Sequence, residues 1–367
     1  MLRNSDIKLN TKLPQLEVER MAVDLIQDKS SLVQALSDIQ AEQAVATWEK
    51  DKTQIFEIIE KSEGGFAALN QRVKGGLREW HVKQFKQLIA ESPHNHLLIL
   101  ACSQVMIELG FLDDALKYGQ QCMSVQISDR KYHADVFDTV GKVYFKQGNY
   151  DNAMEKMVES LPLNRSEFGD SYPDVAACLS SIGDIYIKKG DYEEALEYHN
   201  DSLKIRKEAL GKDSLDVALS YLSLGDIHAS EGKLNKAFEE YNETLSIRLR
   251  CQGENHPDIA RTYHKMSQVC EQQDQLDKAL EYSEKCHSII LNTLGGNHHD
   301  LADTLTTMGN INCSRKEFEQ ALKFHREALD IRKRKYGDTH PSIADSYHLM
   351  AVVYKLIGDS EVISGLS

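Results

Sequence analysis

The sequence predicts an all-α solenoid of helix–turn–helix repeats, and three observations lead to this fold class. A glycine recurs at intervals of 42 residues, at Gly141, Gly183 and Gly225. A turn residue and a small residue follow at fixed distances in each copy, as Gly148 and Ala153, Gly190 and Ala195, Gly232 and Ala237, Asp274 and Ala279, and Lys316 and Ala321. Self-similarity at such a period is the signature of a repeat architecture. The chain holds only six prolines in 367 residues, which suits a mostly helical protein because proline breaks helices.

Composition excludes several classes of protein. The net charge of −14 argues against a nucleic-acid partner, for which a basic stripe is expected. No apolar run approaches the roughly 18 residues of a membrane-spanning helix, and the start, MLRNSDIKLN, lacks the apolar core of a signal peptide. The seven cysteines are scattered without a C-x-x-C pair, as expected for reduced thiols in the cytosol. We therefore expect a cytoplasmic protein that does not insert into membranes.

The first 93 residues precede the regular array. Residues 1–15 are polar and expected to be disordered, and 16–93 are expected to form an N-terminal helical region. Val18, Leu25, Leu32 and Ile39 fall seven apart, but the second apolar track of a coiled coil is missing. These helices either pack on the array or on each other, or they bind a partner or a second copy. Glycines at 64–65 and 75–76 are expected to break the chain, leaving two short helices over 66–90 as a degenerate repeat or half-repeat.

The repeat array is predicted over residues 94–358. Its units are expected at about 94–131, 132–173, 174–215, 216–257, 258–299 and 300–341, followed by a terminal helix at 342–357 and a flexible tail at 359–367. The first unit is four residues shorter than the others, and the unit at 258–299 is the least regular because Ser267, Asp274 and Cys286 replace the usual small residues. Such irregularity reflects drift or marks a hinge or ligand contact.

Each unit carries characteristic residues at the ends of its two helices. Asp174, Asp216, Asp258, Asp300 and Ser342 precede the first helix and are expected to cap its free N–H groups. The second helix ends in basic residues, among them Arg206, Arg248 and Arg332, which suit the negative end of the helix dipole better than a phosphate site.

The terminal helix has two possible roles. It carries Leu349, Val352, Val353 and Leu356. If it is the polar cap that a repeat array needs, then Asp345, His348 and Lys355 form its solvent side. If the chain is a truncated isoform or a fragment, the far apolar side stays exposed and invites dimerisation.

The repeat unit resembles the tetratricopeptide family. The pattern reads Gly183-Asp-Ile-Tyr186, then Gly190-Asp-Tyr192-Glu-Glu-Ala195, then Leu203. The 42-residue spacing and loops such as QGENHPD at 252–258 resemble the repeats of kinesin light chains and nephrocystin-3. This resemblance implies a right-handed superhelix in which the first helix of each pair lines a concave groove. That groove is expected to hold a peptide or helix of another protein.

Candidate groove residues follow from the repeat period. They lie at fixed distances from the repeat glycine: Asp138, Lys142, Phe145, Ser180, Asp184, Ile187, Leu219, Leu222, Asp226, Arg261, His264, Gln268, Thr306 and Asn310. The paired asparagines that kinesin light chains carry before this glycine are absent. Six aspartates lie on the first three tracks against Lys142 and Arg261. A groove with this charge should attract a basic or neutral segment.

The sequence shows no pattern for chemistry. No G-x-S-x-G or H-E-x-x-H motif occurs. Cys270, Cys286 and His298-His299 lie close in sequence, but their spacing matches no zinc site. We therefore predict no catalytic residue, metal or cofactor. The expected function is a non-catalytic scaffold or adaptor that binds a partner segment. The alternative is a regulatory switch whose N-terminal helices occlude the groove until a ligand binds, and self-association through the terminal or N-terminal helices is a further possibility.

Overall fold

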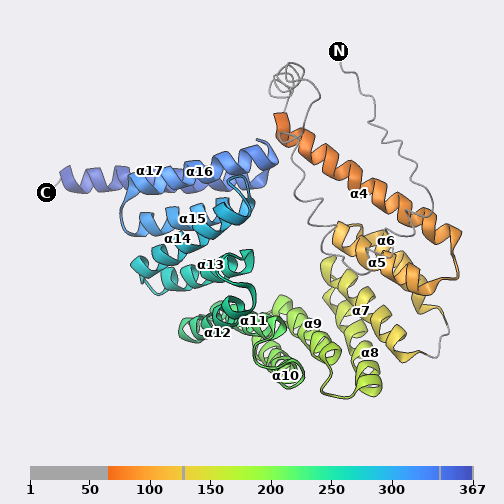
Figure 1. Ribbon diagram of the computed structural model, residues 1–367. Coiled ribbons are helices and arrows are strands. Elements are labelled where there is room, and N and C mark those ends of the chain that lie inside the picture. Colours follow the sequence, from red (N-terminus) through yellow and green to blue (C-terminus); the bar gives the residue numbers. More distant parts are fainter. Residues whose placement is uncertain (1–64, 126–128, 339, 366–367) are drawn as a thin grey trace, which may run out of the picture. The chain divides into compact units, whose positions relative to one another are not determined.

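A computed structural model describes residues 65–125, 129–338 and 340–365 of the chain (Figure 1). This part contains 14 α-helices and no strand. The contacts divide it into two compact units, which are described separately: unit 1 includes Asn70–Asp170 and unit 2 includes Ser171–Ser367. The expectations for residues 1–64, including their disorder and the heptad track, lie outside the described residues.

Unit 1 holds five helices, the first of which is one long helix. They are α4 (Gly65–Glu91), α5 (His96–Leu109), α6 (Leu112–Met123), α7 (Arg130–Lys146) and α8 (Tyr150–Phe168). The expected break at Gly75 and Gly76 is wrong, because α4 runs straight through both. An internal glycine costs a helix only about 1 kcal/mol. Downstream, Val82, Phe85 and Ile89 anchor α4 in the core of α5 and α6.

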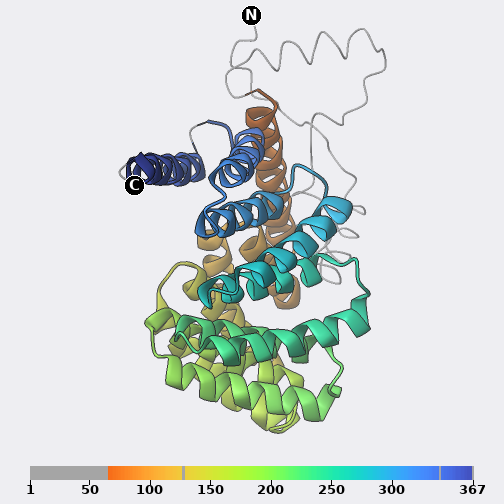
Figure 2. The same ribbon diagram turned by 90° about the vertical axis from the view of Figure 1, so that its left-hand side faces the viewer.

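Unit 2 is built from helix pairs and a last long helix. Its elements are α9 (Pro173–Lys189), α10 (Tyr192–Leu210), α11 (Leu215–Ser230), α12 (Leu234–Gln252), α13 (Pro257–Gln272), α14 (Leu276–Thr293), α15 (His299–Ser314), α16 (Phe318–Tyr336) and α17 (Pro341–Gly365). Each even-numbered helix packs on the first helix of its own pair and on that of the next pair. Figure 2 shows these layers from green to blue. The predicted fold class, an all-α tetratricopeptide solenoid, is confirmed.

Small residues and hydroxyls hold the two helices of a pair together. Ala237 is fully buried. At Gly225 a Cβ atom would lie 2.5 Å from the ring of Tyr241, so only glycine permits this close approach. The hydroxyl of Ser202 donates to the carbonyl of Ala176 (2.8 Å), and Thr244 does the same toward Ala218 (3.3 Å). The regular small positions of the sequence are therefore packing positions.

Arginines at the end of the second helix connect one pair to the next. Arg248 is 3% exposed and donates to the carbonyl of Asp258 (2.7 Å) and to Thr262 Oγ1 (2.8 Å). The guanidiniums of Arg206 and Arg332 likewise donate to Ser220 and Ser346 on the following helix. The basic ends therefore do more than suit the helix dipole, because three of their arginines bond the next repeat directly.

The turn between the helices of a pair needs a left-handed residue. Gly148, Gly190 and Gly232 have φ between 75° and 88°. The predicted substitutes take the same conformation without being glycine, since Asp274 has φ 59° and Lys316 has φ 63°. A side chain in this region is strained by roughly 1–2 kcal/mol.

Two expectations about helix ends are wrong. The caps of α11, α13 and α15 are Ser214, His256 and His298, whose side chains accept from the backbone N–H two residues later. The predicted caps Asp216, Asp258 and Asp300 instead occupy the first turn, as does Asp174 in α9. The cap predicted at Ser342 is likewise a residue of α17, and its N–H donates to His340 Nδ1 (3.3 Å). The second error is at the other end of α17, which continues through Gly358 to Gly365, where a turn and a flexible tail were expected.

Candidate partner-binding face

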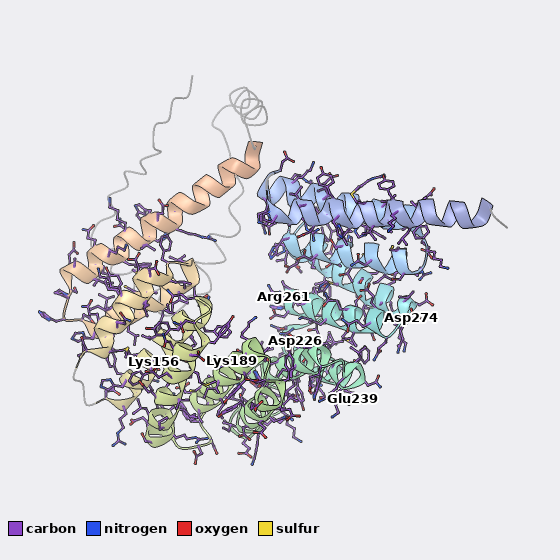
Figure 3. All side chains as sticks on the ribbon, turned by 180° about the vertical axis from the view of Figure 1, so that it is seen from behind. Lys156, Lys189, Asp226, Glu239, Arg261 and Asp274 are labelled. Atoms are coloured by element: carbon purple, nitrogen blue, oxygen red, sulfur yellow. The ribbon has the colours of Figure 1, made fainter. Side chains whose placement is uncertain are left out.

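The first helices of unit 2 share one exposed track. It holds Ala177, Leu219, Arg261 and Asp303, one residue from each of α9, α11, α13 and α15. Leu219 is 48% exposed, and the Arg261 side chain is 62% exposed. Figure 3 shows Arg261 and Asp226 on one side of unit 2, with Asp274 and Glu239 on the opposite side. We call this side, formed by the free faces of these four helices, the first-helix face.

The carboxylate of Asp226 on α11 is contacted by side chains of two other helices. It accepts a hydrogen bond from Tyr241 Oη (2.5 Å) and forms an ion pair with Lys265 Nζ of α13 (3.1 Å). Burial and the adjacent Asp226 carboxylate raise the pKa of Tyr241, which keeps the phenol protonated as the donor. Asp226 is therefore held in place from two helices and remains 40% exposed toward a partner.

Arg261 joins neighbouring first helices. Its guanidinium lies 3.5 Å from Asp258 of its own helix and 3.7 Å from Asp300 of α15. Pairs of this exposed kind contribute little to stability, about 0–1 kcal/mol. The side chain is thus free to exchange these contacts for a partner's acceptor.

His264 is a candidate of intermediate exposure with one buried ring nitrogen. Its Nδ1 atom is buried without a hydrogen-bond partner. Burial lowers the pKa of His264, while the carboxylate of Asp303 pulls it upward and the ammonium of Lys265 lowers it further. A neutral imidazole is the result, so this position adds no positive charge to the face.

Three other candidates are engaged by neighbouring residues of the repeat array. The hydroxyl of Ser180 lies 2.7 Å from that of Ser202 on α10. Leu222 packs on the cluster that contains Tyr241 and Met266. Thr306 Oγ1 donates to the Ala302 carbonyl (2.8 Å). These three side chains contribute more to packing or local bonding than to an open surface.

The remaining candidates of unit 2 are partly exposed. Asp184 Oδ1 lies 3.3 Å from Nε2 of the buried His199 and is 50% exposed. Ile187, Gln268 and Asn310 have intermediate exposure. Their binding role stays a prediction.

The candidates of unit 1 interact mainly with each other and with α8. Asp138 and Lys142 form an ion pair one helical turn apart (2.6 Å). The Phe145 ring lies 5.8 Å from the ring of Tyr150. These contacts leave Lys142 exposed on α7.

Sequence reasoning overlooked the cations that balance the face. Lys265 pairs with Asp226, and Arg332 Nη2 pairs with Asp303 (2.8 Å). Lys265 lies two residues before Ser267, which occupies the position of the repeat glycine, and none of the candidate tracks passes through that place. Arg332 lies on α16, a second helix, whereas the candidate tracks follow first helices. The excess of aspartate along the tracks is therefore partly compensated, although the side chains of Asp184, Asp226 and Asp303 remain 50%, 40% and 54% exposed.

Three adjacent ligand-type residues meet at the start of α15. The donor atoms of His298, His299 and Asp300 lie within 4.8 Å of one another. Protein groups already engage them: His298 Nδ1 accepts from the Asp300 N–H, and Lys335 Nζ lies 2.9 Å from His299 Nδ1. Burial and this lysine lower the pKa of His299. His298 therefore caps α15, and the positive charge of Lys335 disfavours a metal ion at this cluster.

Known proteins contain the same repeat. The model of the family described as tetratricopeptide repeat matches residues 132–208, 174–250, 216–292, 258–334 and 300–363. These overlapping segments span more than half of the 367 residues. The chain belongs to the tetratricopeptide repeat family. A comparison with curated proteins finds no match.

Solved tetratricopeptide structures share the fold. BtubC (BKLC) from P. vanneervenii is 21% identical with a TM-score of 0.54, over 63% of this chain and 92% of that chain. Repeats of a putative kinesin light chain from Podospora anserina are 15% identical with a TM-score of 0.51, over 57% and 98%. A STAND signal-transduction ATPase with a tetratricopeptide repeat sensor, from Pyrococcus horikoshii, is 17% identical with a TM-score of 0.61, over 94% and 50%. At these identities the likeness shows the fold, and the predicted resemblance to kinesin-light-chain repeats is confirmed.

Membership of this family carries a general function. Tetratricopeptide proteins bind other proteins and generally serve as non-enzymatic scaffolds. Within the described part of the chain, no helix is both long enough and apolar enough to span a membrane.

Proposed function

We propose that this chain is a non-catalytic cytoplasmic adaptor that binds a partner peptide or helix along the first-helix face of unit 2. The observation that carries the proposal is Leu219, a large apolar side chain that is 48% exposed on the free face of α11. Asp226 lies two helical turns further along the same helix, held by Tyr241 and Lys265. An apolar anchor beside an oriented carboxylate suits a segment that carries an apolar residue and a cation.

The charges of the face support a basic or neutral partner. Asp184 and Asp226 keep about half of their side-chain surface exposed, and the whole chain carries a net charge of −14. Charge complementarity chiefly speeds association and weakens with salt. We therefore expect partner binding to become slower as ionic strength rises.

A matched pair of leucine substitutions tests the proposal. Leu219→Lys removes the apolar anchor, and Leu291→Lys makes the same change at a leucine of α14 that is 46% exposed. Partners captured by the unaltered full chain should be lost with Leu219→Lys and kept with Leu291→Lys. Equal recovery with both variants would refute binding at this face. Leu222 is a poor choice for substitution because it packs on Tyr241 and Met266.

The regulatory alternative concerns the N-terminal residues. A deletion of residues 1–64 separates the two ideas, because it keeps α4, whose Phe85 and Ile89 belong to the core of unit 1. An adaptor without autoinhibition binds its partner equally well before and after the deletion. A clear gain in affinity would favour the occluded groove instead.

A further inference from the structure

The last helix of unit 2 leaves one face open. On α17, Tyr347 is 50% exposed and Tyr354 is 49% exposed, whereas the residues one repeat earlier, Leu305 and Asn312, are 3% and 2% exposed. Two alanines of the same row, Ala344 and Ala351, are exposed as well. In α15 this row lies under α16, the second helix of its pair: a Cβ atom at Gly309 would lie 2.5 Å from the ring of His325. We call the row Ala344, Tyr347, Ala351 and Tyr354 the open face of α17.

The described chain does not fold back over this face. In the preceding pairs the first helix ends at a left-handed residue, such as Gly232 or Lys316, and the second helix returns along it. At the corresponding position, Gly358, α17 continues as a helix to Gly365. The open face is therefore the position of a second helix that α17 does not provide.

Two cations of α16 border the tyrosines. Arg326 Nη2 donates to Tyr354 Oη (2.7 Å), and Lys333 Nζ lies 5.5 Å from the centre of the Tyr347 ring. A hydrogen bond to Tyr347 raises the pKa of Lys333, which keeps the amine charged. Lys333 Nζ also lies 3.4 Å from the exposed carboxylate of Asp338, and a surface pair of this kind contributes little, about 0–1 kcal/mol, so a partner's carboxylate can replace it. The open face thus combines two half-exposed aromatic rings with two cations at its edge.

The chain contains a covered copy of this arrangement. Three repeats earlier, Lys207 Nζ lies 4.5 Å above the ring of Tyr221, and these residues correspond to Lys333 and Tyr347. There α12 covers the seam, since Tyr221 packs in a cluster with Ile247 of α12. On α12, Glu240 directly precedes Tyr241, whose ring lies against Gly225 of α11. The helix that covers this lysine–tyrosine seam therefore carries a carboxylate next to its contact with α11. Burial raises the pKa of Glu240, and the ammonium of Lys207 lowers it in part.

The residue opposite Ala351 must be small. Ala351 occupies the repeat position of Gly225, where the Tyr241 ring leaves no room for a Cβ atom. In the pair whose first helix has Ser267 at this position, the second helix presents Ser283, and the two hydroxyls lie 2.6 Å apart. A helix that packs on Ala351 is therefore expected to present a residue as small as serine at this position.

We propose that the open face of α17 binds an amphipathic helix of a partner protein. This helix places a small residue against Ala351, and the residue directly before that one is a carboxylate that lies next to Lys333. The apolar side of the helix covers Tyr347 and Tyr354, and its acidic edge meets the cations of α16. This docking surface is separate from the first-helix face and does not depend on it. The occupant is specified by complementary charge and by the way α12 covers the equivalent seam.

A designed peptide tests the proposal on the full chain. The probe is a fluorescently labelled peptide with the sequence of residues 234–252, in which Tyr241→Ser supplies the small residue and Cys251→Ser prevents oxidation. Fluorescence anisotropy should show saturable binding. The parent peptide that keeps Tyr241 should bind about tenfold more weakly because its ring meets the Ala351 methyl.

A charge exchange identifies the site. Lys333→Glu in the full chain should weaken binding about tenfold, and Glu240→Lys in the peptide should restore it. Lys278→Glu, the same change on the exposed surface of α14, should leave binding unaltered. Far-UV circular dichroism of each variant confirms that the helices are intact, so a loss of binding reports on the face.

Four results would overturn the proposal. The first is no saturable binding of the peptide, and the second is binding that Lys333→Glu leaves unchanged. The third is a dimer in sedimentation experiments that Ala351→Arg dissociates, which would assign the face to a second copy. The fourth is binding that appears only after deletion of residues 1–64, which would assign the face to this chain's own N-terminal segment.

Discussion

Two junctions between successive repeats solve the same packing problem differently. Between α12 and α13, the buried Arg248 bonds the Asp258 carbonyl and the Thr262 hydroxyl. Between α14 and α15, Ile290 takes the position of the arginine and lies in an apolar cluster with Leu301 and Leu305. The hydroxyl of Thr304 there meets the thiol of Cys286 (3.2 Å). A solenoid can therefore join its repeats through a charged group with matched acceptors or through apolar packing.

The core of the apolar junction accounts for the irregular unit at 258–299. Its departures, Ser267 and Cys286, are buried and bonded, to Ser283 and Thr304 respectively. They form part of an alternative core, which accounts for them without a ligand. A junction made of apolar contacts and one made of directed hydrogen bonds should respond differently to substitution.

The largest effect is expected from removing the arginine. Arg248→Ala deletes two hydrogen bonds from a charged donor and leaves a cavity, so the free energy of unfolding should fall by about 3 kcal/mol. The neighbouring Arg250, which pairs with Asp213 at the surface, is the control, and its alanine variant should change stability by less than about 1 kcal/mol. Chemical denaturation of the full chain measures both. Equal effects would mean that the Arg248 bonds do not hold the junction.

A double-mutant cycle distinguishes the two kinds of junction more sharply. Arg248→Ala and Thr262→Val should show a coupling energy of about 1–2 kcal/mol, because the two residues share a hydrogen bond. Ile290→Ala and Thr304→Val should couple by less than about 0.5 kcal/mol, because no hydrogen bond joins them. Similar coupling at both junctions would contradict the distinction drawn between them.

Acid should weaken the packing of α16 on α15, where the ring of His325 lies against Gly309. Burial lowers the pKa of His325, and the guanidinium of Arg332 lowers it further. Between this lowered value and the ordinary pKa near 6.5, the unfolded chain binds more protons than the folded chain, so stability falls as the pH decreases through that range. Thermal melts from pH 7.5 to 5 should therefore show a smaller loss for His325→Leu than for the unaltered chain. An unchanged slope would assign the loss to other groups.

The smallest effect is expected at the turns that flank the apolar junction. Lys316 adopts φ 63° where the regular repeats use glycine, and Lys316→Gly should stabilise the chain by about 1 kcal/mol. Gly232→Lys should produce an opposite change of similar size. Denaturation midpoints report both. A destabilised Lys316→Gly variant would show that the lysine side chain contributes contacts of its own.

The sequence period was sufficient to predict the helix pairs and their turns. Asp274 and Lys316 were recognised as turn residues because they occupy glycine positions, and both adopt the left-handed conformation. Gly75, Gly76 and Gly358 were misread for the opposite reason. Glycine permits a turn without requiring one, and neighbouring residues decide whether a helix continues.

The candidate site was harder to predict than the fold. Periodicity indicates which side of a first helix is free, but it does not give the rotation of that helix against its neighbours. Ser180 and Leu222 lie at the edge of the free side and turn into the pair. Lys265 and Arg332, which neutralise Asp226 and Asp303, come from other tracks and another helix. Such pairings depend on three-dimensional proximity that a single sequence does not show.

The hydroxyl contacts between paired helices also limit how this protein can change in length. Ser202 and Thr244 each bond one particular carbonyl of the facing helix, so a single inserted residue within a helix would rotate all later side chains by about 100° and misalign them. An insertion or deletion of whole helical turns leaves the later side chains on the same side of the helix. The helix α6 has 12 residues where α8 has 19, a difference close to two turns of about 3.6 residues each. Insertions and deletions in this family of repeats should accordingly be found in the connecting loops, or within helices as multiples of a full turn.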